Sequence, residues 1–156
     1  MKIMDFLNAQ AVSADLQATD KKGIIKELVG LLAQSGEIKD KDKEKVTKVL
    51  LEREALGSTG IGQGIGIPHG KFAGVNKLIG ACAISHKGVN FESLDGEPAY
   101  IFFLLLAPED SAGPHLKALA RVSRLLKDKY FRDTLKAARD AKLLVKIIKQ
   151  EDLKKI

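Results

Sequence analysis

Residues 99–107 read AYIFFLLLA, an apolar run of strand length that ends at Pro108. A run with so little polar alternation is typical of a strand that is buried on both faces. A second apolar run, LIGACAIS, occupies residues 78–85. The dipeptides Lys87-Gly88 and Asp95-Gly96 between the two runs are typical of turns, so residues 78–107 are expected to form a hairpin-like meander.

Helical spacing of apolar residues surrounds this pair of strands. It predicts helices over residues 19–36 and 40–56 before the glycine-rich segment, and over 115–127, 130–138 and 141–148 after Pro108. Helices on both sides of a strand region in one short chain predict an α/β fold, in which a mixed, mainly parallel sheet has helices packed on both faces. Without repeats or long linkers, residues 1–156 are expected to form a single compact domain.

Composition narrows the class of protein. No apolar run reaches the roughly 18 residues that span a bilayer, and the N-terminus lacks the pattern of a signal peptide, so we expect a cytoplasmic protein without membrane insertion. The single cysteine, Cys82, lies in an apolar strand and is expected to pack in the core. It cannot form an internal disulfide.

The net charge of +6 is unevenly distributed. Residues 1–114 hold 13 basic and 15 acidic side chains, whereas residues 115–156 hold 13 basic and 5 acidic ones. Six Phe, two Tyr and no Trp provide few side chains for stacking on bases. The pattern therefore favours solvated faces of amphipathic helices, and no nucleic-acid partner is expected.

Residues 57–70 read GSTGIGQGIGIPHG, with six glycines and one proline, which excludes a regular helix. The spacing matches neither GxGxxG nor a Walker A loop, so no nucleotide cofactor is predicted. Glycine alternates with isoleucine, which suggests a backbone that is packed on one side and open to close approach on the other. The segment is expected to be a shaped loop that runs into a short strand.

His69 closes this segment, where Pro68 constrains the backbone before it. A neutral imidazole has one nitrogen lone pair that can act as a nucleophile. The hydroxyls of Ser58 and Thr59 and the N–H groups near Gly60 suit an anion. The segment thus predicts a nucleophile beside an anion cradle.

The other polar residues leave alternatives open. His115 is either an ordinary polar residue at a helix start or a side chain that reaches the loop, and Arg53 is either a solvated helix end or a partner for a phosphate. Lys71 is either solvent-exposed or at the rim of the site. His86, at a strand end, is expected to be a surface residue. No HxxxH or HxH spacing supports a zinc site, so no metal is predicted.

The nineteen residues from Arg53 to Lys71, REALGSTGIGQGIGIPHGK, resemble the active-site signature of the type-2 IIA domains of the bacterial phosphoenolpyruvate-dependent sugar phosphotransferase system, the fructose/mannitol class. A second block, HLKALA at residues 115–120, matches as well, and the resemblance spans nearly the whole chain. It is greatest to the stand-alone nitrogen-regulatory branch of this family.

The resemblance implies that His69 accepts a phosphoryl group from the histidine of the carrier protein HPr or its nitrogen-branch paralogue. It implies that His115 orients or stabilises His69, that Arg53 neighbours the phosphohistidine, and that Ser58 and Thr59 line the site. Such a protein is a phosphoryl carrier rather than an enzyme acting on a small molecule, and needs no cofactor.

Two outputs follow from the resemblance. In the first, the phosphorylation state regulates targets such as kinases or transporters. In the second, the phosphoryl group passes to a fructose- or mannitol-type IIB partner during sugar uptake. The absence of a fused IIB segment in this sequence favours regulation but does not decide between them.

Overall fold

The computed structural model describes residues 1–155. It contains one sheet in the order β1-β5-β6-β3-β2, in which β4 also pairs with β6, beyond the end of β3. Three pairings are parallel (β1–β5, β3–β6 and β4–β6) and two are antiparallel. The prediction of a mixed, mainly parallel sheet is therefore confirmed. The strands are β1 (Leu7–Ser13), β2 (Gly60–Gly62), β3 (Ile65–Gly66), β4 (His69–Lys71), β5 (Ile79–Val89) and β6 (Ala99–Ala107).

Strand β6 lies in the middle of the sheet, and this position explains why its sequence is apolar throughout. It pairs with β5 on one side and with β3 and β4 on the other. Ile101, Phe103 and Leu105 pack into the core on one face, whereas Phe102, Leu104 and Leu106 pack into the core on the other. Because successive side chains of a strand point to opposite faces, a strand covered on both faces has to be apolar throughout.

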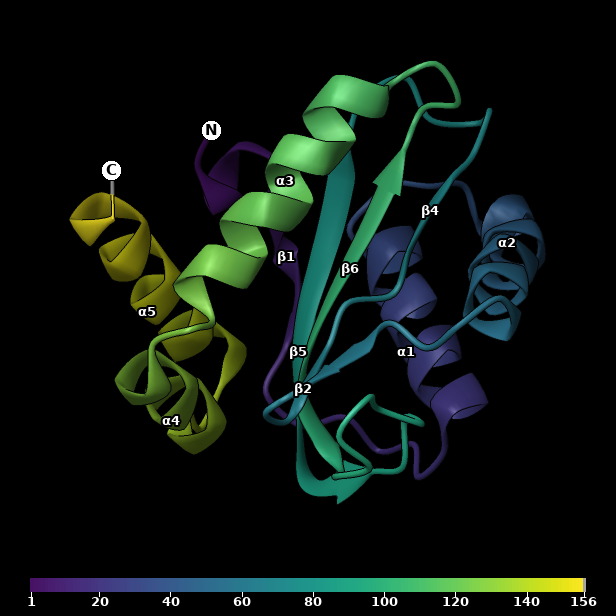
Figure 1. The fold of residues 1–156 in the computed structure, drawn as a ribbon. Helices are drawn as coiled ribbons and strands as arrows, with labels where there is room; N and C mark the ends of the chain where they lie inside the picture. The colour runs from purple at the N-terminus through teal and green to yellow at the C-terminus, as the bar shows by residue number, and fades with distance from the viewer. Residues whose placement is uncertain (156) are drawn as a thin grey trace.

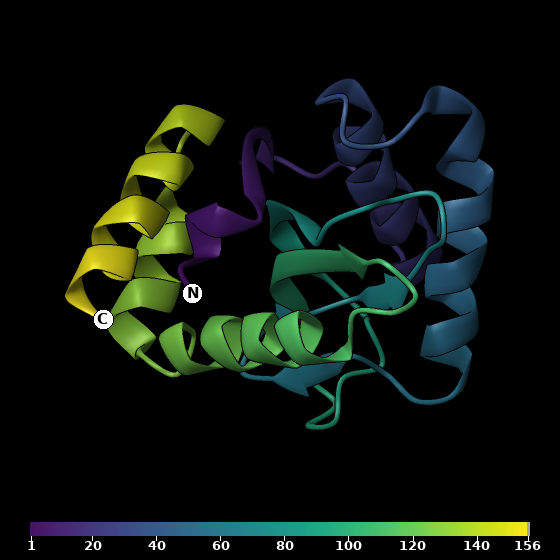
Figure 2. The same cartoon turned by 90° about the horizontal axis from the view of Figure 1, so that it is seen from above.

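Helices cover both faces of the sheet, as expected (Figure 1). Helices α1 and α2 pack on one face, and α3, α4 and α5 pack on the other, as the view from above also shows (Figure 2). Among residues 1–155, no helix combines the length and the apolar character needed to cross a membrane. The helices are α1 (Lys21–Gln34), α2 (Lys43–Ala55), α3 (Ala112–Leu125), α4 (Lys129–Ala137) and α5 (Ala141–Lys154), with short 3-10 turns at Ile3–Asp5 and Asp40–Asp42.

Several boundaries differ from the predictions. Strand β1 was not predicted: Leu7, Ala9 and Ala11 do alternate with Asn8 and Gln10, but alanine and asparagine are poor strand formers, and the register with β5 is interrupted between Leu7 and Val12. Helix α3 begins at Ala112 rather than at His115, since Pro114 is tolerated in a first turn. Helix α5 continues to Lys154, six residues beyond its predicted end. The predicted meander is confirmed by the antiparallel β5–β6 pair.

Candidate functional site

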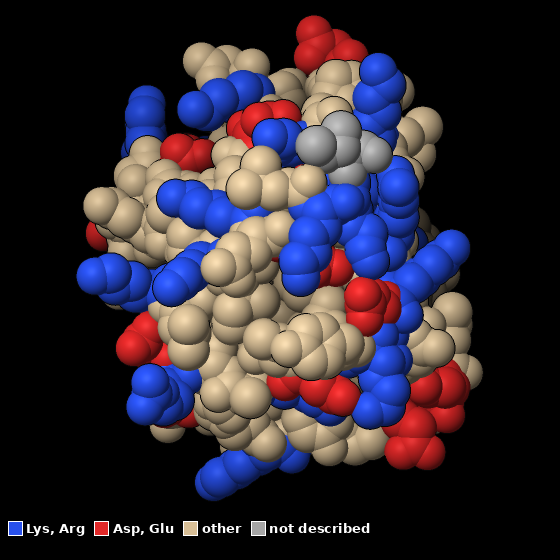
Figure 3. All heavy atoms as spheres, turned by 90° about the vertical axis from the view of Figure 1, so that its left-hand side faces the viewer, with Lys and Arg blue, Asp and Glu red and all other residues tan. Residues whose placement is uncertain are grey.

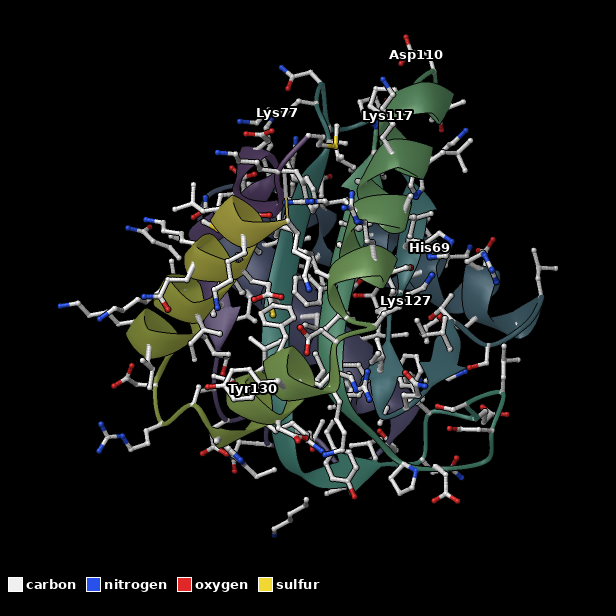
Figure 4. The ribbon with its side chains drawn as sticks, turned by 60° about the vertical axis from the view of Figure 1, so that its left-hand side comes forward. His69, Lys77, Asp110, Lys117, Lys127 and Tyr130 are labelled. Carbon is white, nitrogen blue, oxygen red and sulfur yellow. The ribbon has the colours of Figure 1, made fainter. Side chains whose placement is uncertain are left out.

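A cleft of about 570 Å³ opens where α2, β4 and α3 meet. Figure 4 shows His69 beside α3, on the side of that helix away from α5. Strand β4 packs closely on α2. Gly70 permits this approach, since a Cβ atom at this position would stand only 3.0 Å from Cγ1 of Val49. This approach brings the last turn of α2 next to His69. The cleft is lined by Val49, Glu52, Arg53, Ala55, Leu56, His69, Gly70, Lys71 and His115.

The His69 ring is fixed by one hydrogen bond. Nδ1 lies 2.8 Å from the carbonyl oxygen of Ile67. A carbonyl oxygen can only accept, so Nδ1 carries the proton and the lone pair of the neutral ring is on Nε2. The ring is half-buried and lines the cleft. Nε2 is therefore the nitrogen that is available for chemistry.

His115, from the first turns of α3, stands next to this ring. The two imidazoles meet edge to face, with centroids 5.4 Å apart and planes at 85°. His115 is only 7% exposed, and its Nε2 has no hydrogen-bond partner among the described residues. An unpaired buried polar atom costs about 1–3 kcal/mol. His115 was expected to be either an ordinary polar residue at a helix start or a side chain that reaches the glycine-rich segment. The structure shows the second arrangement, with its ring against that of His69.

Two cations line the same cleft. Arg53 folds back over the end of α2, where its Nη1 donates to the carbonyl oxygen of Gly57 at 2.7 Å. Lys71 is exposed and follows His69 on β4. Within residues 1–155, neither side chain pairs with a carboxylate. The cleft therefore combines the free ring nitrogen of His69 with two cations and one carboxylate, that of Glu52, and this net positive charge favours an anion.

The environment lowers the pKa of both histidines. For His69, burial is the largest cause and the positive charge of Arg53 adds to it, while the hydrogen bond to Ile67 and the charge of Glu54 oppose it. For His115, burial again leads, followed by the charges of His69 and Lys71. A lowered pKa keeps the imidazole neutral at pH 7 and so keeps the Nε2 lone pair of His69 available.

The loop residues Ser58, Thr59 and Gly60 do not line this cleft. The Ser58 hydroxyl donates to the carbonyl oxygen of Phe91 at 2.8 Å, and the Gly60 N–H donates to Ser58 Oγ at 2.9 Å. Thr59 is 3% exposed, and both its N–H and its hydroxyl donate to Glu54. These groups hold the loop in shape, and their predicted contact with phosphate is not supported by this geometry.

The interpretation of the alternating glycines as an open backbone needs correction. A Cβ on Gly60 would lie 2.4 Å from Ser93 Oγ, and one on Gly66 would lie 2.9 Å from the Phe102 ring. The groups that approach the backbone closely are the protein's own side chains. Gly62 and Gly64 have positive φ angles of 96° and 79° and flank the turn that joins β2 to β3.

Glu54 is a further residue of this region that the sequence did not identify. It is 7% exposed, and its Oε1 lies 2.8 Å from Lys21 Nζ and 3.1 Å from the Thr59 N–H. It thus joins α1, α2 and the start of the loop. The signal was its spacing, because Val46 and Leu50, the other buried residues of α2, precede it at intervals of four.

Two predicted assignments outside the cleft are confirmed. Cys82 is fully buried in β5, and burial raises the pKa of its thiol. His86 is exposed near the C-terminal end of β5. Within residues 1–155, no group of three or more histidine, cysteine and acidic side chains is arranged to hold a metal ion.

A family model described as "Phosphoenolpyruvate-dependent sugar phosphotransferase system, EIIA 2" matches residues 5–151. The chain belongs to this family. The resemblance seen in the signature around His69 is thereby confirmed. For brevity we call the chain a type-2 IIA protein.

Individual relatives agree with this assignment. A nitrogen regulatory protein of Bradyrhizobium diazoefficiens is 40% identical over 148 residues, which cover 95% of each chain. The crystal structure of nitrogen regulatory protein IIA-Ntr from Neisseria meningitidis has a TM-score of 0.84 at 33% identity, over 94% of this chain and 98% of that one. The fructose-specific EIIABC component of Bacillus subtilis is 38% identical over 97% of this chain but only 24% of its own length.

The burial and charges around His69 predict how phosphoryl acceptance by this type-2 IIA protein depends on pH. The imidazole resonances of His69 should titrate below the pKa of about 6.5 of an unperturbed histidine. Because the protonated ring has no Nε2 lone pair, the rate of phosphoryl acceptance should fall as the pH drops through this lowered pKa. The replacement Arg53→Gln removes a charge that disfavours protonation, so it should raise the pKa of His69 and move the loss of rate to higher pH.

Lys71→Gln is the matched control, because it removes one positive charge from the same cleft. The Lys71 charge lowers the pKa of His115, so this variant should raise the pKa of His115 more than that of His69. Both pKa values are measured from ring ¹H–¹⁵N spectra between pH 4 and 9. An unchanged His69 midpoint in Arg53→Gln would show that the guanidinium does not act on the ring.

Proposed function

We propose that this protein is a phosphoryl carrier in which Nε2 of His69 accepts a phosphoryl group from a phosphohistidine on HPr or on its nitrogen-branch paralogue. The observation that carries the proposal is the His69 ring, whose Nδ1 is held by Ile67 while its other nitrogen is left for the cleft. Family membership supports the same chemistry. A cytoplasmic location and a single domain over residues 1–156 are part of the proposal.

The hydrogen bond to Ile67 suits the transfer step. The P–N bond of the donor breaks as a bond from phosphorus to Nε2 of His69 forms. The proton on Nδ1 stays in place, so the ring becomes cationic when Nε2 is phosphorylated. The carbonyl oxygen of Ile67, 2.8 Å from Nδ1, stabilises this positive charge. No general base has to remove a proton from the nucleophile.

The surroundings of the ring supply positioning and charge, which account for most of the catalysis in phosphoryl transfer. Arg53 and Lys71 line the cleft and can neutralise phosphoryl oxygens. The unpaired Nε2 of His115 supplies a further polar atom beside the ring, and a phosphoryl oxygen near it would relieve its unpaired state. We assign His115 to holding the phosphorylated His69.

Exposed apolar side chains at the cleft support a protein as the donor. Leu56, which lines the cleft, is 86% exposed, and Leu116, next to His115, is 67% exposed. Exposed leucines beside a shallow cleft are suited to a transient protein contact. We infer that they surround the transferring histidine of the donor.

The primary proposed output is regulatory, with targets such as kinases or transporters that distinguish the two phosphorylation states. The similarity to proteins named nitrogen regulatory protein over nearly the whole chain favours this output. The alternative is transfer to a fructose- or mannitol-type IIB partner, which the similarity to a fructose-specific EIIABC component favours.

The test is reconstitution from purified components. Incubation with phosphoenolpyruvate, enzyme I and HPr should add one phosphoryl group of about 80 Da by intact mass, labile in acid and stable in base, as expected for a phosphohistidine. A protein left unmodified by HPr and by its paralogue would contradict the proposal. Adding a purified fructose-type IIB then separates the outputs, because rapid loss of the group to IIB would support sugar transport over regulation.

A further inference from the structure

Much of the positive charge of this chain lies away from the cleft of His69. Figure 3 shows the side that carries α5, where many Lys and Arg side chains lie among uncharged areas. The exposed lysines of α5 lie outside the cleft, and these are Lys142, Lys146, Lys149 and Lys154. The cations that line the cleft are Arg53 and Lys71. Binding of a phosphoryl group on His69 therefore depends on where these two side chains are held.

Arg53 is held at the end of α2 by a carbonyl oxygen. Leu56 still has a helical backbone conformation, and the Gly57 N–H donates to the carbonyl oxygen of Glu54 at 3.1 Å. Gly57 then adopts a φ of 154°, which residues with a Cβ atom rarely adopt. In this conformation its carbonyl oxygen accepts from Nη1 of Arg53 at 2.7 Å. The guanidinium is thus tied to the backbone four residues after it.

This hydrogen bond restrains a long and flexible side chain. Fixing an arginine side chain removes much conformational freedom, so an unrestrained arginine spreads over many rotamers. Among residues 1–155, the Gly57 carbonyl is the hydrogen-bond partner of the Arg53 guanidinium, and no carboxylate pairs with it. The position of this positive charge in the cleft therefore depends on the backbone conformation of Gly57.

A carbonyl oxygen is a suitable acceptor for holding a cation that has to bind phosphate. It is neutral, so the guanidinium keeps its full positive charge, whereas a paired carboxylate would offset that charge. A guanidinium has several N–H donors, and Gly57 occupies one nitrogen of Arg53. The remaining donors can bind phosphoryl oxygens in parallel pairs. The arrangement fixes the place of the charge and leaves it available.

We propose that Gly57 is a positioning residue for phosphoryl transfer, because its carbonyl oxygen holds the Arg53 guanidinium in the cleft where His69 receives the phosphoryl group. This rests on the proposed function of His69 as the acceptor. The positive charge of Arg53 lowers the pKa of His69, which agrees with a guanidinium that is held towards the ring. A backbone conformation that favours glycine thus acts on the reacting atoms through one side chain.

Gly57 also ends a helix, and this structural role has to be separated from positioning. Gly36 ends α1 in a similar way, since its N–H donates to the carbonyl oxygen of Ala33 at 3.1 Å and its φ is 82°. A Cβ atom on either glycine would meet no atom of the described residues within 4 Å, its chain neighbours excepted. Gly36 and the residues beside it lie outside the cleft. Gly36→Ala is therefore the matched control for strain at a helix end.

The test compares Gly57→Ala, Gly36→Ala, Arg53→Gln and the double variant Arg53→Gln, Gly57→Ala in the full-length protein. The donor is phosphorylated HPr or its nitrogen-branch paralogue, whichever transfers faster, and acceptance is followed by rapid quench and intact mass. Gly57→Ala should lower the maximal rate about tenfold, because a misplaced cation stabilises the transition state less. The same replacement in the Arg53→Gln background should change the rate by less than about twofold, because no guanidinium is left to position. Gly36→Ala should also stay within about twofold of the unmodified rate.

A second readout needs no phosphoryl donor. The pKa of His69, from ring ¹H–¹⁵N spectra, should rise in Gly57→Ala as it does in Arg53→Gln, because the charge that lowers it has moved away. It should not rise further in the double variant, and it should stay unchanged in Gly36→Ala. Urea denaturation verifies that every variant is folded. An unmodified protein that accepts no phosphoryl group would contradict the carrier function, whereas the pKa of His69 reports on Gly57 independently.

Three results would overturn the proposal. One is a Gly57→Ala variant that keeps the unmodified rate or the unmodified pKa of His69. Another is equal slowing by Gly57→Ala with and without Arg53, which would show that the effect does not pass through the arginine. The third is equal slowing by Gly36→Ala, which would show a general effect of strain at a helix end.

Discussion

Replacement of His69 by glutamine is expected to reduce phosphoryl acceptance by at least a thousandfold while the protein stays folded. The variant removes the Nε2 nucleophile, and the remaining histidine of the cleft, His115, has its Nε2 buried. The ring of His69 is half-buried and makes one hydrogen bond, so the loss of stability should be only about 1 kcal/mol. The readout is intact mass after incubation with phosphoenolpyruvate, enzyme I and HPr.

His86→Gln is the control for this variant, because His86 is exposed on β5 and does not line the cleft. It should accept the phosphoryl group at the unmodified rate. Equal acceptance by His69→Gln and the unmodified protein would exclude His69 as the acceptor.

The second large effect is expected from Glu54→Ala, which should lower the free energy of unfolding by about 3 kcal/mol. The side chain of Glu54 is 3% exposed, and that of Lys21, 2.8 Å away, is 14% exposed. Removing the carboxylate leaves the ammonium group of Lys21 nearly buried, with Glu92 at 3.6 Å and the Phe91 ring as its remaining partners. It also leaves the polar groups of Thr59 without their acceptor. Urea denaturation measures the change.

The neighbouring Glu52→Ala provides the matched control. Its side chain is 67% exposed and lies 4.0 Å from Lys48, an exposed pair that contributes at most about 0.5 kcal/mol. Phosphoryl acceptance should also slow in Glu54→Ala, because the loop that leads to His69 starts at Thr59. Equal unfolding midpoints for the two variants would contradict the role of Glu54 as the residue that joins α1, α2 and the loop.

The sequence was informative wherever a local pattern decides the structure. The apolar run of β6 predicted burial on both faces, and the helical spacing of Ile24, Leu28 and Leu32 predicted α1. Strand β1 was not predicted because its short alternating run, with Leu7, Ala9 and Ala11 separated by Asn8 and Gln10, is built mostly from residues that are uncommon in strands. Its place at the edge of the sheet is decided by pairing with β5, far along the chain.

In the candidate site, too, local sequence predicted some features, whereas contacts between distant residues decide others. Pro68-His69 in a glycine-rich segment indicated His69 as the proposed nucleophile, but the choice of nitrogen depends on the carbonyl of Ile67, which only the folded backbone places at Nδ1. The close packing of Gly60 and Gly66 depends on Ser93 and Phe102, which lie more than thirty residues away. Non-local contacts of this kind leave no mark in a local pattern, so the glycines could be interpreted as an open anion cradle.

The most direct measurement of the central claim is the position of the phosphorus atom. After phosphorylation of ¹⁵N-labelled protein, ring ¹H–¹⁵N spectra with ³¹P coupling identify the nitrogen that is bonded to phosphorus. The hydrogen bond between Nδ1 and Ile67 predicts phosphorus on Nε2 of His69, with the proton retained on Nδ1. Phosphorus on Nδ1 of His69, or on either nitrogen of His115, would contradict this account of the site.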